Sequence, residues 1–184
     1  MTEDTSPESL RKFLESDDPA LVMMGLSMAK GSAKASNEVL GMVLGLYLFH
    51  DDTDIRSLAK TTFGKSASSD LRKTVKNYWQ AEYRTTVWIW DGWMQKMVLD
   101  IEDAGINTTY ILARGLMNPK DTEEVDEARS KILDMLGKRI LSVSNLTVHS
   151  SLKNLISTKS WGYKHRENVE AASKILKELD SYNS

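Results

Sequence analysis

Basic and aromatic side chains alternate in two stretches of this sequence, and these stretches are its clearest candidates for binding another molecule. In the first, Arg72, Lys73, Lys76 and Tyr83 fall on one face of a predicted helix, beside Trp79. Lysine and arginine bind phosphates or carboxylates, and aromatic rings stack on bases or anchor protein interfaces. Such a face suits a nucleic acid or an acidic protein partner, and it also suits plain contact with solvent.

The second stretch, from residue 138 to residue 166, contains no Asp or Glu. Its cations are Lys138, Arg139, Lys153, Lys159, Lys164 and Arg166, and His149, Trp161, Tyr163 and His165 lie among them. The same three interpretations apply here. Most of the tryptophans are expected in the core, with Trp88 and Trp161 as the exceptions. The predicted partner-binding residues are therefore Arg72, Lys73, Lys76, Tyr83, Trp88, Lys153, Lys159, Trp161, Lys164 and Arg166.

Other patterns that could carry chemistry have simpler explanations. Residues 59–66 match a relaxed phosphate-loop pattern, but a working loop of this kind follows a buried strand and opens a helix. These residues are instead predicted to end a helix. His50, Asp51, Asp52 and Asp54 resemble a small metal cluster, yet capping of a helix explains the aspartates with less assumption. We expect no catalytic residues, no cofactor and no metal, and hence no enzyme.

The composition is that of an ordinary globular protein. The chain has 184 residues, 41% of them hydrophobic and 27% charged, and its net charge is −2. With so little net charge, any binding of nucleic acid must depend on local patches. The longest apolar run, residues 39–49, is too short to cross a bilayer, and the polar N-terminus is not a secretory signal. We expect a cytoplasmic protein with no membrane contact.

Apolar residues recur with helical periodicity along the chain, and no segment alternates convincingly with period two. Each proline follows a good N-cap residue, which is typical of helix starts. Helices are predicted over residues 7–15, 19–30, 37–49, 53–63, 69–83, 86–103, 107–117, 121–136, 146–157 and 166–179. The 37–49 helix is apolar on all sides, which predicts that protein surrounds it. Its glycines, Gly41 and Gly45, predict a close crossing by a neighbouring helix.

The sequence nearly repeats itself, since residues 17–25 are echoed 34 positions later by residues 51–59. The paired positions are Asp18 and Asp52, Leu21 and Ile55, Met24 and Leu58, and Gly25 and Ala59. A period of this length is typical of stacked helix pairs, in which no single unit can bury its apolar side alone.

The pattern resembles HEAT repeats. The residues that carry the resemblance are Asp52, Ile55, Arg56, Ala59 and Gly64, which fit the second helix of that repeat. The resemblance covers about residues 17 to 80 and implies a stack of antiparallel helix pairs with a concave surface for partners. We therefore expect an all-α fold: a short α-solenoid of nine or ten helices in a single domain, residues 1–184. Two HEAT-like repeats are expected over residues 17–80, and a less regular helical continuation over residues 86–180.

Two functions fit these observations. The first is a non-catalytic module for protein–protein interaction or scaffolding, whose partner has an acidic surface. The alternative is a nucleic-acid-binding helical repeat similar to the alkylpurine DNA glycosylases, which are built from HEAT-like helices. That resemblance implies a basic groove in which Trp88, Trp90, Asp91 and Trp93 could serve. The near-neutral net charge favours the first function, because phosphate binding normally needs a broad basic surface.

Overall fold

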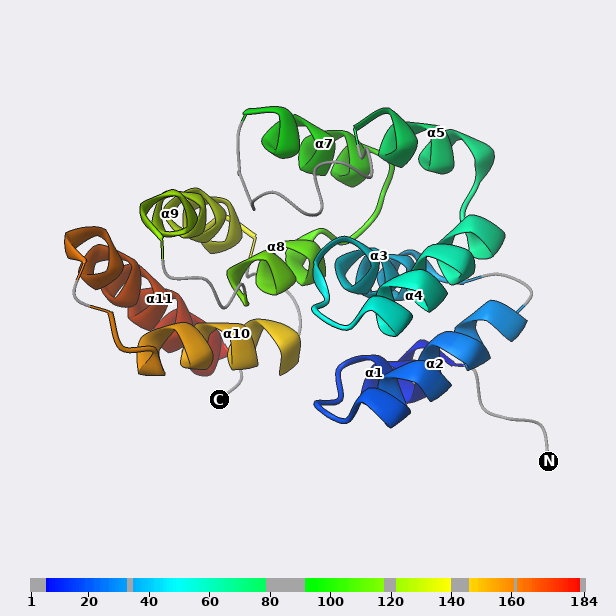
Figure 1. The fold of residues 1–184 in the computed structure, drawn as a ribbon, viewed down its shortest axis with the longest axis horizontal. Coiled ribbons are helices and arrows are strands. Elements are labelled where there is room, and N and C mark those ends of the chain that lie inside the picture. Colours follow the sequence, from blue (N-terminus) through cyan, green and yellow to red (C-terminus); the bar gives the residue numbers. More distant parts are fainter. Residues whose placement is uncertain are drawn as a thin grey trace.

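The computed structural model describes residues 6–32, 35–78, 92–117, 122–139, 146–160 and 162–182. Every regular element in these ranges is a helix, and none is a strand, which confirms the all-α prediction. The helices are α1 (Pro7–Leu14), α2 (Pro19–Gly31), α3 (Asn37–Phe49), α4 (Thr53–Ser66), α5 (Ser69–Tyr78), α7 (Gly92–Asp103), α8 (Thr109–Leu116), α9 (Glu123–Gly137), α10 (Leu146–Ser157) and α11 (Tyr163–Tyr182) (Figure 1).

Polar side chains start many of these helices. The side chains of Ser6, Asp18, Ser36, Asp52 and Thr122 accept hydrogen bonds from backbone N–H groups at the starts of α1, α2, α3, α4 and α9. The Asp52 carboxylate accepts two of them, from Asp54 at 2.8 Å and from Ile55 at 3.2 Å. Pro7 and Pro19 lie in the first turns of α1 and α2 as predicted, whereas Pro119 lies outside the described residues.

Eight of the described helices pack in two groups that meet at α3 and α8. In the first group α1 packs against α2, α3 against α4, and α2 lies beside α4 (Figure 1). In the second, α8 contacts α9, α9 contacts α11, α11 contacts α10, and α10 contacts α8. Helix α8 also packs against α3, and α5 packs against α7. The first group is thus a row of packed helix pairs, while the contacts of the second group close on themselves.

Helix α3 is the central helix, as its sequence predicted. All eleven residues from Val39 to Phe49 are buried. A methyl group on Gly41 would overlap the carbonyl oxygen of Asn107, and one on Gly45 would lie 3.1 Å from the carbonyl oxygen of Tyr110. Both glycines therefore permit the close approach of α8 and the segment before it, which confirms the predicted crossing.

The two copies of the repeat occupy related places, but their apolar positions are not equivalent. Asp18 and Asp52 cap α2 and α4, which lie side by side. Ile55 is fully buried, whereas Leu21 is 36% exposed and Met24 is 50% exposed. The buried side of α2 instead consists of Val22, Gly25, Leu26 and Ala29. Among the described helices, α1 and α4 pack against α2, whereas Leu21 and Met24 lie on its exposed side, so the predicted equivalence of Leu21 with Ile55 is wrong.

Two helices end differently from one another at glycine. Gly105, with φ of 89°, follows α7, and it is the one residue with positive φ in the described ranges. Helix α4 continues past Gly64 to Ser66, because a glycine without positive φ need not stop a helix. Among the described helices, none has the length and apolar content that a membrane crossing requires.

Candidate functional site

Helix α5 presents its predicted basic residues together on one exposed side. Leu71 and Val75 are buried, and the periodicity of the helix places Arg72, Lys73 and Lys76 on the opposite, exposed side. One guanidinium nitrogen of Arg72 donates a 2.7 Å hydrogen bond to the carbonyl oxygen of Gly64, which ties the start of α5 to the last turn of α4. This bond also satisfies a carbonyl group that the end of α4 would otherwise leave without a partner.

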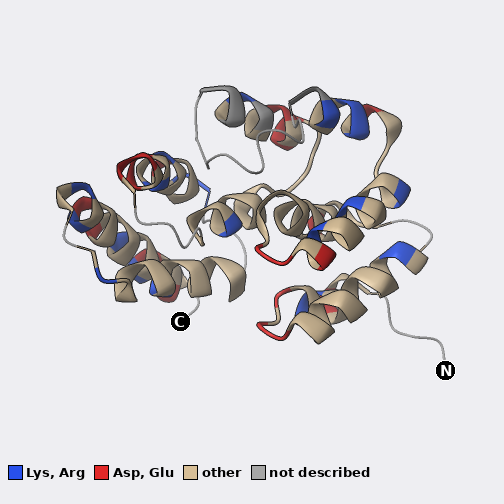
Figure 2. Cartoon of the chain, viewed as in Figure 1, with Lys and Arg blue, Asp and Glu red and all other residues tan. Residues whose placement is uncertain are grey.

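Lys65 is exposed next to Gly64 and extends this basic surface onto α4. We call Lys65, Arg72, Lys73 and Lys76 the α4–α5 basic corner. Figure 2 shows acidic residues at the N-terminal end of α4 and basic residues toward its C-terminal end; α5 carries basic residues and one acidic residue, Asp70, in its first turn. Within the described ranges, no carboxylate oxygen lies within ion-pair distance of the three lysines. Their charges are therefore available to a partner.

The second basic stretch is less positively charged in the structure than its sequence suggests, because acidic residues from other helices pair with its cations. Nε of Arg139 lies 2.6 Å from Oε2 of Glu102 on α7. Lys164 lies 3.4 Å from a carboxylate oxygen of Glu127 on α9 and 3.5 Å from one of Glu167. The carboxylate of Glu127, more than that of Glu167, raises the pKa of the Lys164 ammonium. Within the described residues, three of the six cations of this stretch, Lys138, Arg139 and Lys164, are thus paired with carboxylates.

Four predicted residues of this stretch can be placed. Lys153 and Lys159 are exposed, Lys164 is paired as above, and the guanidinium carbon of Arg166 lies 5.9 Å from the ring centre of Tyr163. Helices α10 and α11 lie on the far side of α3 and α8 from α5 (Figure 1). The two basic sets therefore do not meet in one groove. Tyr83, Trp88, Trp90, Asp91, Trp161 and the side chain of Trp93 lie outside the described residues.

The phosphate-loop pattern and the histidine–aspartate cluster both serve the local structure of α4. Residues 59–66 are part of α4, so their N–H groups belong to a helix and do not form a loop. Asp52 caps α4, and its own N–H donates to Nδ1 of His50 at 3.0 Å. Arg56 donates to the carbonyl oxygens of His50 at 2.6 Å and Asp51 at 2.8 Å. Among the described residues, no group of His, Asp and Glu is arranged to hold a metal ion.

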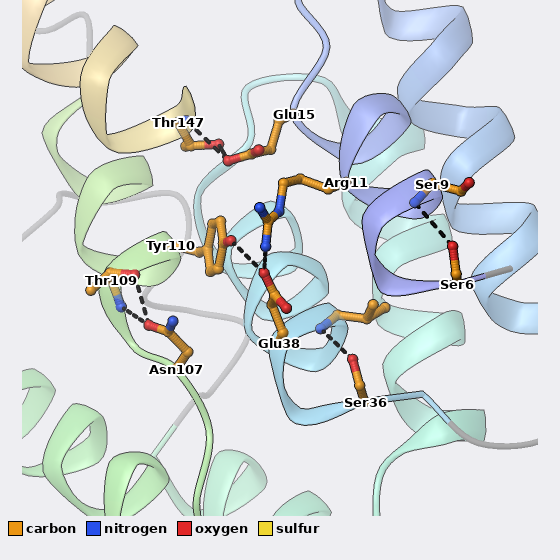
Figure 3. A network of polar contacts seen from close by, with 11 residues as sticks. Ser6, Ser9, Arg11, Glu15, Ser36, Glu38, Asn107, Thr109, Tyr110 and Thr147 are labelled. Carbon is orange, nitrogen blue, oxygen red and sulfur yellow. Dashed lines mark hydrogen bonds and ion pairs between the residues drawn. The ribbon is translucent and has the colours of Figure 1, made fainter. Parts of the chain in front are cut away.

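Sequence reasoning did not find a network of polar side chains where α1, α3, α8 and α10 meet (Figure 3). Arg11 forms an ion pair with Glu38, and the hydroxyl group of Tyr110 donates to Glu38 at 3.2 Å. Glu15 accepts hydrogen bonds from the backbone N–H of Thr147 at 3.0 Å and from its hydroxyl group at 2.8 Å. We call these five residues the polar seam. Its partners are 72 and 132 positions apart, so no local pattern could reveal it.

Burial changes the protonation behaviour of groups in and near the seam. Burial raises the pKa of Tyr110, and the negative charge of Glu15 raises it further. On the same helix, burial lowers the pKa of Arg114, whose surroundings include the acidic residues Glu15 and Asp17. Burial also lowers the pKa of His50, with Arg114 contributing. The hydrogen bonds of Tyr110 to Glu38 and of Thr147 to Glu15 thus connect the two groups of helices, while the ion pair of Arg11 with Glu38 joins α1 to α3 within the first group.

The ionisation of Glu102 should make the stability of the fold depend on pH. The hydrogen bond from Arg139 lowers the pKa of Glu102 below its ordinary value of 4.5, and the hydroxyl group of Thr108 adds a bond of 2.7 Å. A carboxylate with a lowered pKa stabilises the fold above its unfolded pKa, and this contribution disappears as pH falls through the folded pKa. We expect Glu102→Gln to flatten the pH dependence of the free energy of unfolding between roughly pH 5 and pH 3.

Urea unfolding at several pH values measures this effect. Because Glu102 is 39% exposed, solvent screening keeps the change modest. Glu170→Gln, a matched change at an exposed position on α11, should retain the wild-type profile. An unchanged profile in the Glu102 variant would show that the Arg139 contact does not stabilise the ionised form.

The fold and the surface together define a class: an all-helical protein with two packed N-terminal helix pairs and an exposed basic corner. No known family, no characterised protein and no solved structure matches the chain.

Proposed function

We propose that this chain is a non-catalytic protein-binding module of the HEAT-like repeat type, and that the α4–α5 basic corner holds an acidic surface of its partner. The paired helices α1 with α2 and α3 with α4 support the repeat assignment, as do the aspartate caps of α2 and α4. Arg56, which fits the repeat pattern, donates hydrogen bonds to the carbonyl oxygens of His50 and Asp51, directly after the C-terminal end of α3.

The observation that carries this proposal is the set of exposed cations without described carboxylate partners at one corner. Lys65, Lys73 and Lys76 are exposed, and Arg72 is held by its hydrogen bond to Gly64, so one fixed guanidinium lies among three exposed ammonium groups. Such a surface attracts an acidic protein over a distance of about 10 Å at moderate salt. The other predicted set contributes less, since its Lys164 is already paired.

Affinity capture with charge-reversed variants tests the proposal. The tagged full-length chain is incubated with extract of its source cells at about 50 mM salt, where electrostatic attraction is strong. We expect Lys73→Glu combined with Lys76→Glu to reduce recovery of a stoichiometric protein partner roughly tenfold, because both substitutions replace attraction by repulsion. Quantitative mass spectrometry of the captured proteins gives the measurement.

The matched control is Lys153→Glu combined with Lys159→Glu, which changes the charge equally on the other side of the molecule. This control should keep the partner. Equal loss in both variants would mean that net charge alone drives capture. Recovery of nucleic acid in place of protein, abolished by nuclease, would instead support the alternative of a nucleic-acid-binding repeat.

A further inference from the structure

Helix α2 has the sequence of a buried helix, yet one of its sides is exposed. From Pro19 to Ala29 it contains no charged residue. Pro19, Ala20, Leu21, Met24 and Ser27 are nevertheless exposed. An ordinary surface helix carries charged residues on its outer side, so this composition predicts a covering surface.

The two neighbouring helices show how unusual this is. Helix α3 is uncharged from Val39 to Phe49, and all of those residues are buried. Helix α4 is exposed on one side and carries Asp54, Lys60 and Lys65 there. Helix α2 combines the apolar composition of α3 with the exposed side of α4. In stacked helical proteins the outer side of a terminal unit is normally polar. The exposed side of α2 departs from this rule.

We propose that a second copy of this chain covers α2, with the two α2 helices packed antiparallel about a two-fold axis at Met24. The charges at the ends of the helix favour this occupant. Asp17 and Asp18 precede its first turn, and Lys30 lies in its last turn. An antiparallel pair brings the acidic end of each copy to the basic end of the other, whereas a parallel pair brings like charges together.

The side chains on the exposed side are also self-complementary. In such a pair, the residue three positions before Met24 lies against the one four positions after it on the other copy, and the residue four positions before lies against the one three positions after. Leu21 then lies against Met28, a half-buried residue that borders the exposed side of α2. The two Met24 side chains meet on the axis. Ala20 lies against Ser27, and both are small enough to allow close packing.

Cysteine cross-linking tests this arrangement directly, because the natural chain has no cysteine. At about 100 µM protein, a concentration suited to a small interface, Met24→Cys should form a disulfide-linked dimer under mild oxidation. Thr61→Cys on the exposed side of α4 is the matched control and should remain largely monomeric. A mixture of Ala20→Cys and Ser27→Cys chains should cross-link to each other faster than either chain does to itself.

Sedimentation velocity on the cysteine-free protein supplies the second measurement. We expect the measured mass to rise with concentration from 20.7 kDa toward twice that value. Met24→Glu should lower the association constant of the dimer at least tenfold, and Thr61→Glu should leave it unchanged. A wild-type protein that stays monomeric at about 100 µM would overturn the proposal. Equal cross-linking of the Met24 and Thr61 variants would overturn it as well, and preferential self-linking of the Ser27 variant would contradict the antiparallel arrangement.

Discussion

Replacing Gly41 by alanine should lower the free energy of unfolding by about 2–3 kcal/mol. The added methyl group would overlap the carbonyl oxygen of Asn107, a backbone atom just before α8. Backbone cannot rotate away as the end of a flexible side chain can, so α3 and α8 must separate. Both are buried along their contact, and their separation loosens the central packing. Urea unfolding followed by circular dichroism measures the change.

Gly64→Ala is the matched control, because it makes the same substitution inside another helix. A methyl group on Gly64 meets no atom within 4 Å, and α4 continues on both sides of the residue. We expect this variant to be more stable than wild type by about 0.5–1 kcal/mol, since alanine has the higher helix propensity. Equal effects of the two substitutions would mean that α8 does not cross α3 at Gly41.

Asp126→Ala should have the largest effect of any single substitution considered, a loss of about 3–5 kcal/mol. Oδ1 of Asp126 lies 2.8 Å from a guanidinium nitrogen of Arg129, and the two side chains are 7% and 5% exposed. Removal of the carboxylate leaves a positive charge in the interior without this partner. The same region is held by Asn168 of α11, whose amide donates to the carbonyl oxygen of Asp126 at 2.9 Å.

Two further variants separate the charge from the packing. Asp126→Ala combined with Arg129→Met removes both charges and should recover much of the lost stability, because no buried charge remains. Asp134→Ala breaks the pair with Lys138, the C-cap residue of α9, where both side chains are about 70% exposed, and should change stability by no more than about 0.5 kcal/mol. A small effect of the Asp126 substitution would show that Arg129 reaches solvent in solution.

Local patterns in the sequence were sufficient to predict most of the helices. Asp18 and Asp52 were recognisable as caps because their side chains bond to N–H groups within three positions. The bounds of α3 and α10 match their predicted ranges, 37–49 and 146–157. The burial of α3 followed from its lack of any polar side, and the crossing at Gly41 from the cost of glycine in a helix.

The candidate site could be predicted only in part, because charge pairing depends on residues far apart in the chain. The three cations on α5 lie on one side of a single helix, so helical periodicity was enough to place them together. Lys164 was expected to face a partner, but Glu127 approaches it from another helix, as Glu102 approaches Arg139 in the same stretch. The exposure of Leu21 likewise depends on which neighbours α2 lacks.

The binding proposal is tested most directly by mapping where a partner touches the chain. A lysine-reactive cross-linker applied to the captured complex labels each exposed lysine near the bound protein. We predict intermolecular cross-links at Lys65, Lys73 and Lys76, and few at Lys153 and Lys159, although all five are exposed. Cross-links concentrated at Lys153 and Lys159, with none at the α4–α5 basic corner, would contradict the binding proposal.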